Sequence, residues 1–139
     1  MKIPPQCSFF RLTIQTYIHP TESADKLEAA LKGIIRLSTI NVERQNNMLV
    51  GKSSQIESLS MVYEQTRARR SVSVLRRMLL HNLESNTTFL LLNKQAAAAG
   101  VVSLIDRESE SPLGGIRIEI QCHPIQQVID WLTYAIHAD

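Results

Sequence analysis

Residues 116–124 read IRIEIQCHP, and this stretch decides the fold of the chain. Its apolar and polar residues alternate, which is the pattern of a strand with one face buried. Residues 12–20, LTIQTYIHP, show the same alternation before the same His-Pro pair. Proline stops a strand ladder, and a helical pattern follows each pair. The repeated unit is either a weak internal duplication or a strand-to-helix turn reached twice independently.

The segments between these two units predict further helices and strands. Ser23 is the expected N-cap of a helix whose apolar face runs from Leu27 to Ile35. Further along, Gly51–Ser54 opens a helical region with a bend near residues 69–71. The remaining predictions are two strands around Asn46-Asn47 within Thr39–Lys52, a central strand at Thr87–Leu92, a short alanine helix closed by Gly100, a strand at Val101–Ile105, a polar loop at Asp106–Gly115 and a closing helix that carries Val128 to Ile136.

Length and composition fit one globular domain over residues 1–139. The chain has 44% hydrophobic and 20% charged residues, and a formal net charge of +2. Disorder is not expected at this composition, and the weak basicity does not by itself indicate nucleic acid. No apolar run approaches the ~18 residues needed to cross a bilayer, and the start lacks a signal-peptide pattern. We therefore predict a cytoplasmic α+β domain.

The strongest functional candidate is a basic helical segment. From Gln65 to Leu83 the chain has five arginines and no acid. Guanidinium groups are permanent, forked donors that suit phosphate. The alternatives are a solvated surface that offsets acids elsewhere, and a surface for a protein partner. The five are Arg67 and, within one arc of about 120° on a helix at ~100° per residue, Arg69, Arg70, Arg76 and Arg77.

Two further cations are candidate additions to this surface. Lys94 lies in Asn93-Lys94-Gln95, at a predicted strand-to-helix junction where free N–H groups attract anions. Alternatively, Asn93 simply caps the short helix. Arg117 lies on the last predicted strand.

The sequence carries no recognisable catalytic or metal-binding motif. Cys7 and Cys122 match no disulfide framework, so a reduced compartment is expected. His123 adjoins Cys122, and on a regular strand the two side chains would face opposite ways. We predict a protein that is not an enzyme, with no cofactor and no metal.

Several segments resemble one archaeal family of predicted RNA-binding proteins. They are Phe89–Ala97 (FLLLNKQAA), Glu110–Gly114 (ESPLG), Ile116-Arg117, His19–Glu22 (HPTE) and Ile129–Leu132 (IDWL). The resemblance covers nearly the whole chain. It implies a fold similar to the RNA-binding domain of the ribosomal protein that contacts 5S rRNA, with a mixed, mostly antiparallel sheet and helices packed on one face. It also implies a homodimer. The chain departs from the family pattern at Ala98, Val101 and Gly115.

These observations predict a non-catalytic RNA-binding protein. The arginine segment would contact the phosphate backbone, giving salt-sensitive binding that is largely independent of sequence. No tyrosine or tryptophan is interleaved with its arginines, which argues against a stacking platform for single strands. Structured RNA recognised by shape is therefore expected. The alternative is a protein-interaction or homodimerisation module with no role in nucleic-acid binding.

Overall fold

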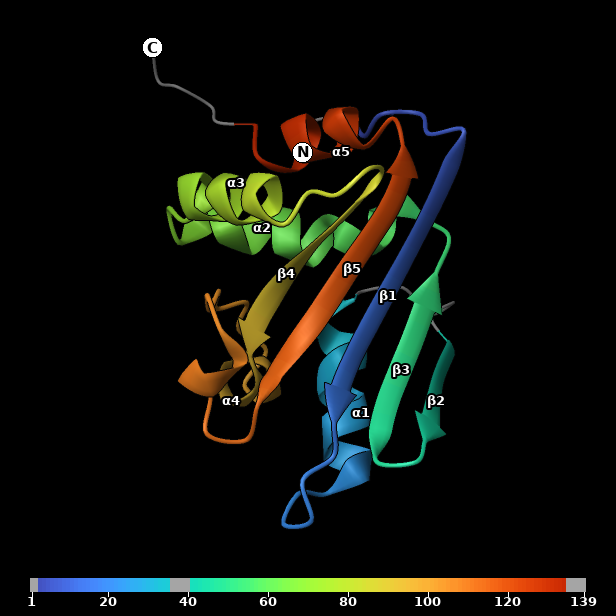
Figure 1. The fold of residues 1–139 in the computed structure, drawn as a ribbon. Coiled ribbons are helices and arrows are strands. Elements are labelled where there is room, and N and C mark those ends of the chain that lie inside the picture. Colours follow the sequence, from blue (N-terminus) through green and yellow to red (C-terminus); the bar gives the residue numbers. More distant parts are fainter. Residues whose placement is uncertain (1–2, 36–40, 135–139) are drawn as a thin grey trace.

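The computed structural model describes residues 3–35 and 41–134. Five strands form one sheet in the order β2-β3-β1-β5-β4, and all four pairings are antiparallel. Helices α1 and α2 lie behind the sheet in Figure 1, whereas the face toward the viewer carries no described helix. The predicted α+β class, with a mostly antiparallel sheet and helices on one face, is confirmed. The elements are β1 (Phe9–Tyr17), α1 (Ala24–Ile34), β2 (Asn41–Gln45), β3 (Met48–Ser53), the 3-10 helix η1 (Ile56–Leu59), α2 (Ser60–Ala68), α3 (Val72–His81), β4 (Thr87–Asn93), α4 (Lys94–Ala98), η2 (Glu108–Glu110), β5 (Gly115–His123) and α5 (Ile125–Leu132).

The two stretches that decide the fold pair with each other at the centre of the sheet. β1 and β5 are antiparallel neighbours, with Leu12 opposite Ile120 and Ile14 opposite Ile118. These side chains are at most 1% exposed and form the core beneath the helices. Their alternation therefore places every second residue of both strands on the opposite, uncovered face.

Local sequence signals set the boundaries of several other elements. The Ser23 hydroxyl accepts a hydrogen bond from the Lys26 N–H at 3.3 Å and caps α1 as predicted. Asn46 has φ 56°, in the left-handed region that asparagine tolerates, and it turns β2 into β3. Gly100, with φ 78°, follows the alanine helix α4. Thr39, Ile40 and Ile136, which belong to predicted elements, lie outside the described residues.

Three predictions about the order and extent of strands are wrong. The apolar segment Thr87–Leu92 is not central, because β4 stands at the edge of the sheet. Val101–Ile105 forms only one isolated bridge, between Leu104 and Leu92. Gly51–Ser53 ends β3 and does not open a helix. The edge of β4 can be apolar because the Asn93 N–H donates to the Ser103 carbonyl and the Ile105 N–H donates to the Leu91 carbonyl, which covers that end of the strand.

Candidate nucleic-acid interface

The predicted arginine helix is two helices. The expected break is confirmed, because α2 ends at Ala68 and α3 begins at Val72. The Ser71 N–H donates to the Thr66 carbonyl at 2.8 Å and the Arg70 N–H to the Arg67 carbonyl at 3.1 Å. This pair of bonds is the Schellman ending of a helix. The four arginines predicted to share one helical arc, Arg69, Arg70, Arg76 and Arg77, therefore do not lie on one continuous helix, and that part of the prediction is wrong.

Arg70 occupies the left-handed position of this helix ending. Its φ is 55°, where glycine is the usual residue because it has no Cβ. Both Arg69 and Arg70 are exposed, and neither side chain has a hydrogen bond or ion pair within the described residues. The turn between α2 and α3 therefore presents two adjacent, unpaired guanidinium groups to solvent.

Arg76 and Arg77 lie on α3 and point to different acids. Arg76 donates to the Asp130 carboxylate at 2.9 Å and to the Thr133 hydroxyl at 3.1 Å. The guanidinium of Arg77 is 3.5 Å from the Asp106 carboxylate. All four charged side chains of the two pairs are at least 42% exposed, so solvent screens both pairs and a polyanion could compete for the arginines.

Arg67 is engaged inside the protein. It donates to the Tyr63, Trp131, Leu132 and Tyr134 carbonyls and so closes the C-terminal end of α5. The guanidinium also lies 3.5 Å from the centre of the Tyr63 ring, which in turn stacks on Trp131. Partial burial lowers the pKa of Arg67. Arg67 therefore has a structural role in this fold and does not belong to the proposed RNA surface.

Lys94 is also a structural cation. Its side chain is 2% exposed, and its ammonium donates to the Tyr17 carbonyl at 2.7 Å, the Leu113 carbonyl at 2.7 Å and the Glu22 carboxylate at 3.0 Å. An ammonium has three donors, so none remains for a phosphate. Asn93 caps α4 by accepting a hydrogen bond from the Ala96 N–H at 2.9 Å, which is the structural alternative for this segment.

Arg117 projects from β5 onto the uncovered face of the sheet. Its guanidinium lies 3.7 Å from the centre of the Phe89 ring, on the neighbouring strand β4. It also contacts the Glu119 carboxylate at 3.1 Å. At the start of β1, the Arg11 guanidinium lies 5.3 Å from the centre of the Phe9 ring. The sheet thus brings arginine and phenylalanine side chains together. The sequence-based argument against stacking considered only tyrosine and tryptophan, so it did not predict these contacts.

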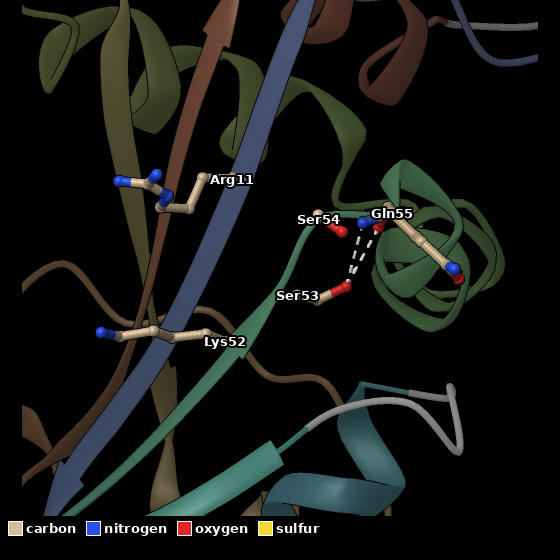
Figure 2. A pocket seen from close by; sticks show the side chains of 5 residues that line it. All are labelled: Arg11, Lys52, Ser53, Ser54 and Gln55. Atoms are coloured by element: carbon tan, nitrogen blue, oxygen red, sulfur yellow. Dashed lines mark hydrogen bonds between the residues drawn. The ribbon is translucent and has the colours of Figure 1, made fainter.

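A second basic feature of this face was not identified from the sequence. Arg11 and Lys52, from β1 and β3, line a hollow of about 240 Å³ together with Ser53, Ser54 and Gln55. Figure 2 shows the two cationic side chains extended in front of the sheet. Neither forms an ion pair within the described residues, and no carboxylate lines the hollow. Two unpaired cations on one side of a hollow without a carboxylate form a site suited to an anion. The alternation of polar and apolar residues on β1 could have indicated this position, because it places Arg11 on the same outward face as Thr13 and Gln15.

The two cysteines meet beside this end of the sheet. The Sγ atoms of Cys7 and Cys122 are 2.9 Å apart, and both thiols are free. Burial, followed by the contact with Cys7, raises the pKa of Cys122 to about 12. The thiol of Cys122 is therefore protonated at neutral pH.

None of the described helices is both long and apolar enough to span a membrane.

These features define a small α+β domain with an open antiparallel sheet that carries cations on its uncovered face. A model of a family described as RNA binding matches residues 11–122, and the chain belongs to this family. Relatives called UPF0201 protein include one from Sulfurisphaera tokodaii, 34% identical over 88% of this chain and 86% of its own, and one from Aeropyrum pernix, 32% identical over 88% and 84%.

Solved structures share this fold. The UPF0201 protein from Methanococcus jannaschii is 26% identical, with a TM-score of 0.73 over 88% of this chain and 98% of its own. A second structure, titled as an uncharacterized UPF0201 protein, is 25% identical, with a TM-score of 0.67 over 80% and 81%. The archaeal family expected from the Phe89–Ala97 and Glu110–Gly114 motifs is thus confirmed. The likeness to the ribosomal 5S-rRNA-binding protein stays a prediction.

Proposed function

We propose that this protein is a non-catalytic RNA-binding protein whose uncovered sheet face contacts the phosphate backbone. The observation that carries the proposal is the hollow between Arg11 and Lys52, where two unpaired cations stand without a carboxylate. Membership of a family described as RNA binding supports the same class of ligand. Phosphate contacts of this kind release counterions, so binding should weaken steeply as salt rises.

The turn between α2 and α3 is a second proposed contact. Arg69 and Arg70 supply unpaired charge there, and Arg76 and Arg77 can exchange exposed acids for phosphates. The conformation of Arg70 also supports a role in binding, because a charged side chain stands at a position with φ 55°, where glycine is the usual residue. Strain of this kind is a reason to look for function. These four residues are the part of the predicted arginine surface that we retain as a phosphate contact, and Arg117 lies apart from them, on the sheet.

Fluorescence anisotropy tests the proposal with a labelled single-stranded RNA of mixed sequence and a duplex RNA of matched length. The variant Arg11→Gln/Lys52→Gln removes the hollow's charges. Lys26→Gln/Lys32→Gln on α1 is the matched control, because it removes two charges from the helical side of the sheet. On single strands each phosphate contact contributes about 0.7 to the slope of log affinity against log salt concentration. Loss of two contacts should therefore make the fall in affinity between about 50 and 200 mM salt roughly sevenfold smaller than in wild type. Absence of binding at the lower salt, or equal effects of both double variants, would reject the proposed surface.

A protein partner, including a second copy of this chain, is the other candidate function. Val74 and Leu80 are 37% and 42% exposed on α3, with Arg77 between them in sequence. Apolar side chains on a charged helix suit a partner more than a phosphate backbone. Light scattering coupled to size exclusion tests self-association, and Val74→Ser/Leu80→Ser should abolish any dimer formed through α3. A monomer at high protein concentration would reject the homodimer.

A further inference from the structure

A larger hollow lies on the β4 side of the same sheet face. It has a volume of about 440 Å³ and is lined by residues of the α3–β4 connection, of β4 and of β5: Asn82, Glu84, Ser85, Thr87, Phe89, Arg117 and Glu119. Hollows of this size accept small organic groups. Unlike the hollow at Arg11 and Lys52, this one contains an aromatic ring and two carboxylates. Its lining therefore favours a different part of a nucleotide.

The Phe89 ring and the Arg117 guanidinium form a stacked pair in this hollow. The 3.7 Å from the guanidinium carbon to the ring centre places one planar face of the guanidinium on the ring. The Arg117 side chain is 34% exposed, so part of it remains accessible to a ligand in the hollow. The Glu119 carboxylate, 3.1 Å away, holds the guanidinium in this orientation. Nucleobases stack on guanidinium planes of this kind when they are not already stacked in a helix.

The carboxylates in the hollow discriminate against phosphate and in favour of base edges. Glu119 is partly neutralised by Arg117, but Glu84 is exposed and has no ion pair within the described residues. An ionised carboxylate only accepts hydrogen bonds, so it repels phosphate oxygens and accepts from the amino groups of bases. Adenine, cytosine and guanine carry an exocyclic amino group, and uracil does not. The lining therefore suits an amino-bearing base.

The two hollows lie close enough to be occupied by one short strand. Phe89 on β4 pairs with Glu119 on β5, which pairs with Thr13 on β1. Arg11 lies two residues before Thr13 on the same strand. With strands ~4.8 Å apart and ~3.4 Å per residue, the backbones at Phe89 and Arg11 are about 12 Å apart. A run of a few nucleotides spans that distance. Its bases would enter the hollow at Arg117 while its backbone reached Arg11 and Lys52.

We propose that the Phe89–Arg117 hollow is a stacking site for an unpaired, amino-bearing nucleobase, so that the protein selects single-stranded RNA over duplex RNA. This inference rests on the proposed RNA-binding function and adds the class of RNA. It replaces the expectation of structured RNA read by shape, which followed from the lack of tyrosine and tryptophan among the arginines. Phenylalanine supplies the stacking surface instead.

The test compares short homopolymeric RNAs of adenosine, cytidine and uridine with an RNA duplex. Arg117→Lys keeps the charge but removes the planar group, and Glu84→Ala removes the free carboxylate. Arg117→Lys should weaken binding of the adenosine and cytidine oligomers at least about fivefold, with the salt slope unchanged. Glu84→Ala should narrow their advantage over the uridine oligomer. Lys26→Gln/Lys32→Gln on α1, behind the sheet, is again the control and should change neither quantity.

The outcomes separate this inference from the function on which it rests. Salt-dependent RNA binding that falls in Arg11→Gln/Lys52→Gln but is unchanged in Arg117→Lys would reject the stacking site and leave the phosphate surface standing. A preference for duplex over the adenosine oligomer would also reject it. If no RNA binds at low salt, both proposals fail. Circular dichroism of each variant checks that the fold is retained, and an upfield shift of the Arg117 Nε–H resonance on adding the adenosine oligomer reports stacking directly in the wild type.

Discussion

Replacement of Lys94 by methionine separates its structural role from the RNA-binding role that the sequence suggested. The change removes an ammonium that donates to two carbonyls and to Glu22, and it leaves the carboxylate without its cation. Methionine fills most of the same volume, so packing loss is small. The structure predicts a large loss of stability, with RNA affinity of the folded protein unchanged.

The magnitude follows from the burial of the pair. Lys94 is 2% exposed and Glu22 is 12% exposed. Removal of one partner from a buried ion pair costs ~3–5 kcal/mol, and the slight exposure of Glu22 points to the lower end, about 3 kcal/mol. For a domain of this size that corresponds to a fall in Tm of roughly 10 °C. Glu22→Gln in the same chain should recover part of the loss, because it removes the uncompensated charge.

Urea denaturation and thermal melting measure the stability, and anisotropy at a temperature well below the variant's Tm measures RNA binding. The control is Lys26→Met, an exposed lysine at the start of α1, which should stay within about 0.5 kcal/mol of wild type. A Lys94→Met variant that is as stable as wild type but binds RNA more weakly would refute the structural assignment. It would also restore the predicted phosphate contact.

Three further predictions concern the α2–α3 segment and the buried thiol. Arg67→Met should lower the free energy of unfolding by about 2 kcal/mol in urea denaturation, because two α5 carbonyls lose their donor. Arg76→Met should lower it by less than about 0.5 kcal/mol, and equal losses would contradict the assigned roles. Arg70→Gly should match or exceed wild-type stability in the same assay while weakening RNA binding, since glycine suits φ 55°. The pKa of Cys122 is raised to about 12 from 9.0, so the unfolded thiol ionises first. Stability is therefore complete below the unfolded pKa and is lost as pH rises toward the folded one. The urea midpoint should fall more between about pH 8 and pH 10 in wild type than in Cys122→Ala, and parallel pH dependences would argue against the shift.

Elements whose boundaries depend on local chemistry could be predicted from the sequence. Alternation in β1 and β5 reflects burial of one face only, and the Ser23 cap and the Asn46 turn each depend on a few neighbouring residues. Strand order depends on long-range pairing, which one sequence does not encode locally. The apolar residues of β4 are typical of a central strand, yet they occupy an edge because residues 103–105 cover it.

The candidate site was harder to predict for the same reason. Counting arginines along a helix correctly indicates a basic segment, but it cannot show that Arg67 closes α5 or that Arg76 meets Asp130. Both partners are more than 50 residues away in sequence. The hollow at Arg11 and Lys52 joins two strands that are likewise distant in sequence, so only the register of β1 and β3 brings it together.

The most direct measurement of the RNA surface is a titration of the isotope-labelled protein with a single-stranded adenosine oligomer, followed by amide chemical shifts. We expect shifts concentrated on outward-facing positions of β1, β3, β4 and β5, around Arg11, Lys52 and Arg117, with further shifts at the α2–α3 turn around Arg70 and with α1 unaffected. Shifts that leave the outward-facing positions of the sheet unchanged, or no shifts at low salt, would contradict the proposed RNA surface.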